Sequence, residues 1–291
     1  MKSVQSLIGS YTDRLKVLYY HFSIVHLMDL VFGFDVVRKS VEEYFGYAAE
    51  HGLSHLEVDL IRGHSFIETF DAERINNLRG LSEQFGISLS LHTPFTINPS
   101  DKIPTIRDAN IAYLKRCVSV AHELNATHLT THVGYCLGVK PSKQKALARL
   151  VANLKQVLQD CRKLEVKLAI ENVNPMPEGS ELFYLGDSIE ECKFLLSELD
   201  SPYLNLCLDI GHANMNEGPL AYIQKFGKKI INVHFHDNNG KTDGHLDVGE
   251  GTVPWKQVVE ALKRINFCGP FVSECFNSEP HEAKTALQKY F

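Results

Sequence analysis

Short apolar segments alternate with longer amphipathic segments along most of the chain. The short segments are rich in β-branched and aliphatic residues and predict strands, whereas the longer segments carry apolar residues at helical spacing. The predicted strands are Val17–Ile24, His55–Leu60, Ser88–Thr93, His128–Val133, Lys167–Val173, Leu204–Asp209, Ile230–Asp237 and Pro270–Phe276. The predicted helices are Val36–His51, Ala72–Phe85, Thr105–Leu124, Lys143–Leu164, Ser188–Leu199, Pro219–Phe226, Trp255–Ile265 and Glu282–Tyr290. Strands that alternate with helices in this way predict a parallel sheet.

The predicted strands have two unlike faces. Ser88, Ser90 and His92 alternate with two leucines in one strand, and Asn205 alternates with leucines in another. An open doubly wound sheet needs two apolar faces, whereas a barrel packs its apolar face under helices and fills a narrow interior. No linker divides the 291 residues. The pattern therefore predicts an α/β protein with a single (β/α)8 TIM-barrel domain over 1–291, in which 1–14 form an N-terminal extension, either a tail or a lid.

Composition and charge narrow the class of protein. Hydrophobic residues make up 44% and charged residues 22% of the chain, and the formal net charge is −5. This balance disfavours a nucleic-acid partner, which usually needs a basic patch. The seven cysteines form an odd, scattered set without a CxxC pair, which indicates reduced cysteines and a cytoplasmic protein. The apolar stretch Val17–Phe34 is interrupted by His21, His26 and Asp29, so we expect no membrane span.

Ionisable side chains stand at or just beyond the carboxyl ends of the predicted strands. They are His92, His132, Glu171, Asp209, His212, His234, Asp243, His245 and Glu274. Each has an ordinary alternative explanation, such as a salt bridge, a helix cap or a solvated turn. Barrel enzymes, however, build their sites at this end of the strands. Carboxylates and imidazoles gathered there would bind divalent cations, so the pattern predicts a metal-dependent enzyme.

The motifs around these residues resemble one known superfamily. They are IEN at Glu171, CLDIGH at Asp209, VHFHDN at His234, DGHLDVGEG at Asp243 and SECF at Glu274. Together they are similar to the xylose isomerase-like TIM barrels, which include sugar and sugar-phosphate isomerases and epimerases and the apurinic/apyrimidinic endonuclease IV group.

The resemblance implies up to three metal positions. Glu171, Asp209, His234 and Glu274 match the one-metal site of the epimerases. In the endonuclease group, a second ion would be bound by His92 and His132 together with Glu171. A third would be bound by His212, Asp243 and His245. The expected cofactor is Zn, Mn, Co or Mg, with one to three ions per chain.

The resemblance also implies a mechanism, and we expect an isomerase or epimerase that acts on a sugar or sugar phosphate. Glu171 and Glu274 would exchange protons with a substrate carbon, through an enediolate. His236 and Asn172 would contact the substrate, and Lys241 would neutralise a phosphate or carboxylate on it.

Three alternatives stay open. The first is an endonuclease IV-like zinc phosphodiesterase that acts on abasic DNA or another phosphoester, which the complete ligand set favours. The charge balance and Phe95, where the resemblance leads us to expect tyrosine, argue against DNA. The others are a related lyase and a metal-stabilised binding module without catalysis. The sequence makes no prediction about oligomeric state.

Overall fold

Eight parallel strands close into a barrel. The computed structural model describes residues 30–138 and 142–291, and in them the barrel strands follow the order β1-β10-β9-β8-β6-β4-β3-β2. These strands are β1 (Val31–Val36), β2 (His55–Asp59), β3 (Ser88–His92), β4 (Leu129–Thr131), β6 (Leu168–Glu171), β8 (Leu204–Asp209), β9 (Ile230–Phe235) and β10 (Pro270–Ser273). The predicted (β/α)8 barrel is confirmed.

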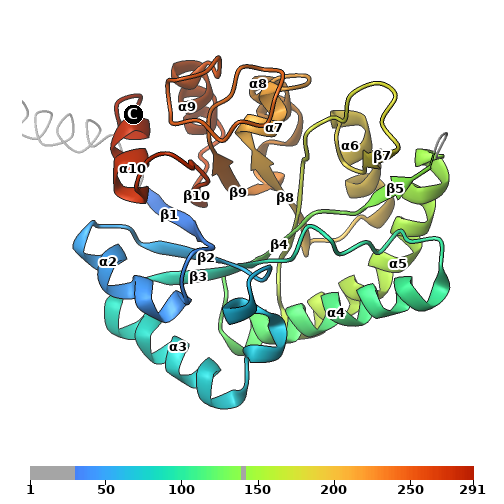
Figure 1. Cartoon of the computed structure of the whole chain (residues 1–291), viewed down its shortest axis with the longest axis horizontal. Coiled ribbons are helices and arrows are strands. Elements are labelled where there is room, and N and C mark those ends of the chain that lie inside the picture. Colours follow the sequence, from blue (N-terminus) through green and yellow to red (C-terminus); the bar gives the residue numbers. More distant parts are fainter. Residues whose placement is uncertain (1–29, 139–141) are drawn as a thin grey trace, which may run out of the picture. The chain divides into compact units, whose positions relative to one another are not determined.

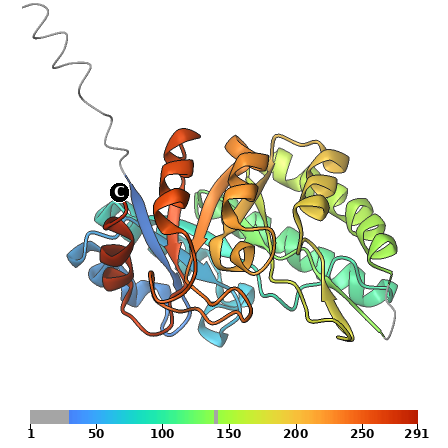
Figure 2. The same ribbon diagram turned by 90° about the horizontal axis from the view of Figure 1, so that it is seen from above.

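Helices surround the strands (Figure 1). They are α2 (Phe45–Glu50), α3 (Ala72–Phe85), α4 (Pro104–Glu123), α5 (Lys143–Leu164), α6 (Ile189–Leu199), α7 (Ile210–Asn214), α8 (Pro219–Phe226), α9 (Trp255–Arg264) and α10 (Pro280–Gln288). Four 3-10 turns accompany them, η1 (Val41–Tyr44), η2 (Gly63–Ser65), η3 (Ile67–Thr69) and η4 (Gly227–Lys229). Helix α10 lies beside β1, so the two ends of the described barrel meet (Figures 1 and 2).

The two faces of the barrel strands carry different kinds of side chain, apolar on one face and small or polar on the other, as the alternation predicts. Leu89 and Leu91 of β3 are buried apolar residues, whereas Ser90 between them bonds to His55 and Glu57 of the neighbouring strand β2 inside the barrel. Thr130 of β4 and Asn232 of β9 face the same interior. Small and polar side chains thus fill the barrel, and the leucines pack under the helices.

The predicted start of the barrel is wrong. The strand expected at Val17–Ile24 lies outside the described residues, and the first barrel position is occupied by β1, within the apolar stretch that continues to Phe34. A Cβ atom added to Gly33 of β1 would lie 2.5 Å from the backbone oxygen of His55, so β1 and β2 approach each other closely there. The helix predicted from Val36 consequently begins later, as η1 followed by α2.

An antiparallel hairpin was also missed by the sequence analysis. It consists of β5 (Tyr135–Leu137) and β7 (Leu182–Tyr184), which pair outside the barrel sheet. Both strands are only three residues long, so their alternation is too short to be recognised. They extend the loops after β4 and β6, and Tyr184 reaches the cavity described below.

Two further expectations can be compared with the structure. All seven cysteines are free, as predicted, and five of them are buried. Among residues 30–138 and 142–291, no helix combines the length and the apolar character that a membrane crossing requires. The proposed extension at 1–14 falls outside the described residues.

Candidate active site

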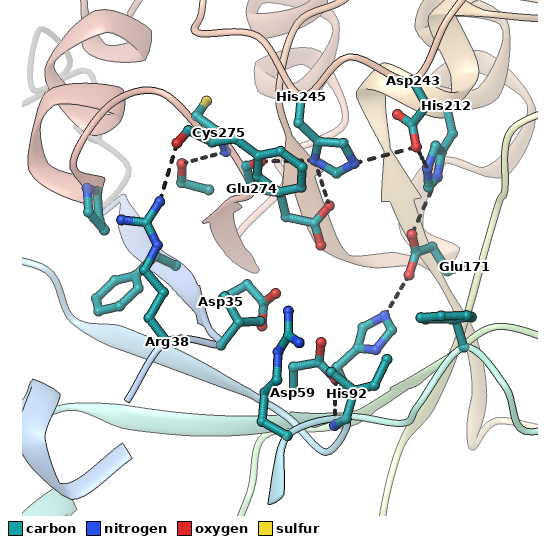
Figure 3. Close-up of a pocket in the computed structure, with 18 of the residues that line it drawn as sticks. Asp35, Arg38, Asp59, His92, Glu171, His212, Asp243, His245, Glu274 and Cys275 are labelled. Atoms are coloured by element: carbon teal, nitrogen blue, oxygen red, sulfur yellow. Dashed lines mark hydrogen bonds and ion pairs between the residues drawn. The ribbon is translucent and has the colours of Figure 1, made fainter. Parts of the chain in front are cut away.

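A cavity of about 440 Å³ opens at the carboxyl ends of the barrel strands. Its lining includes Glu171 at the end of β6 and Glu274 immediately after β10. Figure 3 shows both carboxylates pointing into this space. The other predicted site residues that line it are His92, His132, His212, Asp243 and His245. Asp209 and His234 are fully buried, each at 0% exposure.

The four residues matched to the one-metal site come together. The Nδ1 atom of His234 lies 3.0 Å from Oε1 of Glu274 and 3.6 Å from Oε2 of Glu171. A carboxylate oxygen of Asp209 lies within 4.8 Å of donor atoms of Glu171 and, in a second grouping, of Glu274. The two distances from His234 suit neighbouring donors around one ion, because metal–ligand bonds of about 2.0–2.2 Å place such donors roughly 3–4 Å apart.

Strand register explains this convergence. Asp209 of β8 pairs with His234 of β9, and His234 pairs with Val272 of β10, two residues before Glu274. Asn172 connects the adjacent strand ends, since its amide nitrogen donates to the Asp209 carbonyl and its Oδ1 accepts from the Asp209 backbone N–H, each at 2.9 Å. The tips of β6, β8, β9 and β10 therefore stand at one level.

Imidazoles surround Glu171. His92 Nε2 and His132 Nε2 lie 2.9 and 3.4 Å from its Oε2, and His212 Nδ1 lies 3.4 Å from Oε1. Burial opposes ionisation of Glu171, but the neighbouring histidines hold the pKa of this carboxyl well below its usual range. Burial likewise opposes the charge on His92, and its hydrogen bond to Glu171 raises the pKa of the ring to about 10. The Glu171 carboxylate is thus the shared partner of several nitrogen donors.

A second group of donors lies beside the first. One donor atom from each of His212, His236, Asp243 and His245 falls within a common 4.8 Å limit. His236 stacks on His245 with ring centroids 3.9 Å apart, and it does not line the cavity. His245 has φ of +44°, an uncommon left-handed conformation for a residue with a side chain. His236, predicted to bind substrate, is instead placed with this donor group.

The donor chemistry fits divalent ions. Asp209 Oδ2, His234 Nδ1, His236 Nε2 and Asp243 Oδ1 are buried atoms without a hydrogen-bond partner among the described residues. Buried polar atoms are usually paired, so these atoms need a bound partner. Carboxylate oxygens and imidazole nitrogens are suitable ligands for Zn, Mn, Co or Mg. The residues present therefore fit a metal centre at this end of the barrel.

Two predicted substrate contacts are not in the cavity. Asn172 is buried in the strand contact described above, and Lys241 is an exposed residue of the loop after β9. Arg38 and Arg62 line the cavity instead, from the loops after β1 and β2. The arginine side chains that line the cavity thus come from the loops after β1 and β2, and not from the loop after β9 that carries Lys241.

Three acidic residues of β1 and β2 were missed by the sequence analysis. Asp35 and Asp59 line the cavity (Figure 3), and Glu57 lies in the barrel interior. Burial raises the pKa of Asp35 well above its usual range and that of Asp59 to about 6. The alternation in His55–Asp59 was a usable signal, but with the first strand placed at Val17–Ile24, Asp35 was assigned to no strand.

Known proteins are similar to this chain over most of its length. The model of the xylose isomerase-like TIM barrel family matches residues 45–290. The chain is 26% identical to an uncharacterized protein of Methanocaldococcus jannaschii over 273 residues, which is 91% of this chain and 90% of that protein. It is 24% identical to fructoselysine 3-epimerase of Shigella flexneri, over 87% of this chain and 93% of the epimerase.

A solved structure agrees with these relatives. The crystal structure of a D-tagatose 3-epimerase-like protein matches with a TM-score of 0.79 and 26% identity, covering 90% of this chain and 97% of that one. The family match extends over most of the chain and includes the strands from β2 to β10. The chain belongs to the xylose isomerase-like TIM barrel family, and its characterised homologues are sugar epimerases.

Proposed function

We propose that this protein is a divalent-metal-dependent epimerase of a hydroxyketone sugar or sugar phosphate. The observation that supports this most strongly is the pair of carboxylates, Glu171 and Glu274, which point into one cavity on either side of His234 Nδ1. The relatives that are named as sugar epimerases support the reaction class.

Glu171, Asp209, His234 and Glu274 would hold the ion. When bound, a divalent ion supplies a Lewis acid that polarises a carbonyl group and makes a neighbouring C–H bond more acidic. The barrel places all four ligands on strands or at strand ends, where backbone hydrogen bonds fix them. Rigid support of this kind holds reacting groups in position.

Glu171 and Glu274 would divide the proton transfers. One carboxylate removes and keeps the proton of the substrate carbon beside the carbonyl, which gives an enediolate, and the other, after it has taken up a proton from solvent, delivers that proton to the opposite face. Burial opposes ionisation of Glu274, but His234 lowers the pKa of this carboxyl to about 2. The lowered pKa of each carboxyl suits the role of general base, and the carboxylate that acts as acid must first gain a proton from solvent.

Exchange of substrate hydrogen with solvent deuterium tests the two-carboxylate mechanism. Glu171→Gln and Glu274→Gln should each lower exchange and turnover by about 100- to 10,000-fold, because each removes an acid–base group. Glu279→Gln is a matched control, since Glu279 lines the same cavity but belongs to neither ligand group. Either site variant exchanging at the wild-type rate would show that the mechanism is wrong.

A phosphoesterase is the second candidate. It is favoured by the second donor group around His212, Asp243 and His245, because multi-ion sites cleave phosphoesters. Metal analysis and two assays separate the candidates. About one ion per chain with activity on ketoses or ketose phosphates supports the epimerase. Near three zinc ions with cleavage of an abasic-site duplex would favour the phosphoesterase.

A further inference from the structure

Glu57 is a buried carboxylate in the barrel interior that the proposed mechanism does not use. It lies in the middle of β2 at 0% exposure and does not line the cavity. Its Oε1 atom is 2.5 Å from Nε2 of His234, which lies across the barrel on β9. A buried charge without a role is costly, so the partners of Glu57 indicate what it does.

The other oxygen of Glu57 is held in place by three donors. Oε2 accepts hydrogen bonds from Ser90 Oγ at 2.6 Å, Asn232 Nδ2 at 3.1 Å and Thr130 Oγ1 at 3.2 Å. His128 Nε2 lies 3.3 Å from the same oxygen. These partners come from three different strands, β3, β4 and β9, and from the residue before β4. The carboxylate is therefore fixed from several sides, and Oε1 remains for His234.

His234 faces a carboxylate at each ring nitrogen. Nε2 meets Glu57, and Nδ1 lies 3.0 Å from Oε1 of Glu274 without a hydrogen-bond partner among the described residues. A contact of 2.5 Å between nitrogen and a carboxylate oxygen requires a proton between them, because two lone pairs would repel. With the Nε2 proton committed to Glu57, Nδ1 is the ring nitrogen that can give up its proton and bind a cation shared with Glu171 and Glu274.

We propose that Glu57 is a positioning residue that fixes His234 in the orientation and tautomer that offer Nδ1 to the divalent ion. The inference rests on the metal site of the proposed function and deepens it. Carboxylates that bond to the far nitrogen of a ligating histidine orient the ring and increase its basicity. Glu57 does not line the cavity, so it acts through His234.

The affinity of the protein for a divalent ion tests whether Glu57 positions His234 or only contributes to packing of the barrel interior. Glu57→Gln should weaken binding of Zn²⁺ or Co²⁺ by about 10- to 100-fold in competition with a chelator, as loss of such partners does. Thr130→Val is the matched control, because it removes one bond to the other oxygen of Glu57 and leaves the contact with His234. Its affinity should change by less than about threefold by the same reasoning. Equal losses in the two variants, or no loss in Glu57→Gln, would overturn the proposal.

A second measurement needs no substitution at Glu57. In the zinc-loaded wild-type protein, nitrogen NMR of the imidazoles should show His234 ligated through Nδ1 with a proton on Nε2. The resonance is assigned by its loss in His234→Asn. Ligation through Nε2 would overturn the proposal even where Glu57→Gln fails to fold.

The outcomes also separate this inference from the proposed function. Wild-type metal affinity in Glu57→Gln, together with epimerase activity in the wild type, would refute the positioning role alone. Nδ1 ligation and the predicted loss of affinity, together with no epimerase activity on the sugar panel, would refute the proposed function alone.

Discussion

Glu171 is the residue on which the two donor groups meet. Its Oε2 faces His92, His132 and His234, and its Oε1 faces His212. This arrangement explains why a buried carboxylate stays ionised without a Lys or Arg partner, since several imidazoles share its charge. Across the cavity, Asp35 and Asp59 have the opposite environment, where burial favours the protonated acid.

Asp59 gives a prediction about pH. Its pKa in the folded protein is about 6, above the value of 3.8 for a free side chain, so folding favours its proton. The stability this proton contributes is complete below about pH 4 and is lost as the pH rises through 6. In chelator-treated protein, Asp59→Asn should therefore match the wild type near pH 4 and be more stable than it at pH 8. Urea unfolding at both pH values measures this, and an equal difference at the two values would contradict it.

At the scale of elements, the loop between β9 and α9 carries three of the four members of the second donor group. The buried side chain of Asp237 anchors this loop. Its Oδ1 accepts from the backbone N–H groups of Asn238 and Val253. Its Oδ2 accepts from the backbone N–H of Gly249 and from the indole N–H of Trp255. The backbone of Asp237 also pairs with Leu246 in an isolated bridge. Asp243 and His245 are thus held in place by a buried carboxylate at the base of their loop.

Trp255→Phe tests this anchor. The change removes the 2.8 Å bond from the indole N–H to Asp237 and leaves a smaller ring in a buried position. It should lower the free energy of unfolding by roughly 2–4 kcal/mol, measured by urea denaturation. It should also weaken any metal binding that depends on His245.

Phe267→Leu provides the control for the anchor. Phe267 is buried after α9 and packs against Phe271 of β10, so its replacement reduces core packing without touching Asp237. We expect it to lower stability and to leave metal stoichiometry unchanged. The same loss of metal binding in both variants would show that general destabilisation, not the anchor, is responsible.

At the scale of the whole molecule, the proposed metal site joins four consecutive strands of the barrel with a fifth strand farther round it. Its donors come from β6, β8, β9 and the end of β10, and His92 adds β3. In the absence of cations, these strands bring several carboxylates together at one end. A divalent ion that binds the folded chain more tightly than the unfolded chain therefore stabilises the entire barrel.

Removal of the ion with a chelator should therefore lower the free energy of unfolding. At a free Mn²⁺ or Zn²⁺ concentration about 100 times the Kd, the folded state should gain about 2.7 kcal/mol over chelator-treated protein. Asp209→Asn is the matched control, because the remaining oxygen can still accept from the His212 N–H while the charged metal ligand is lost. Its unfolding midpoint should respond little to the ion. Identical midpoints of the wild type with and without ion would contradict a specific site.

The pattern of hydrophobic and polar residues along the sequence was enough to predict most strands and helices of the barrel. Alternation over five or six residues identified β3, β8 and β9, and Ala72–Phe85 was predicted with the bounds of α3. The positions of the candidate site residues were also readable, because an ionisable residue at the tip of an apolar strand has little use in a core. Seven of the nine ionisable residues predicted at strand ends line the cavity, and Asp209 and His234 are buried.

Only the tertiary structure decided where the barrel begins and what supports its ligands. The apolar stretch from Val17 to Phe34 offers several strand registers of similar hydrophobicity, and only closure against β2 and β10 selects β1. Glu57 and His234 are 177 positions apart, and their contact follows from barrel curvature, which no local pattern contains. Side-chain alternation thus determined which face each residue occupies, whereas the pairing of distant strands determined which residues meet.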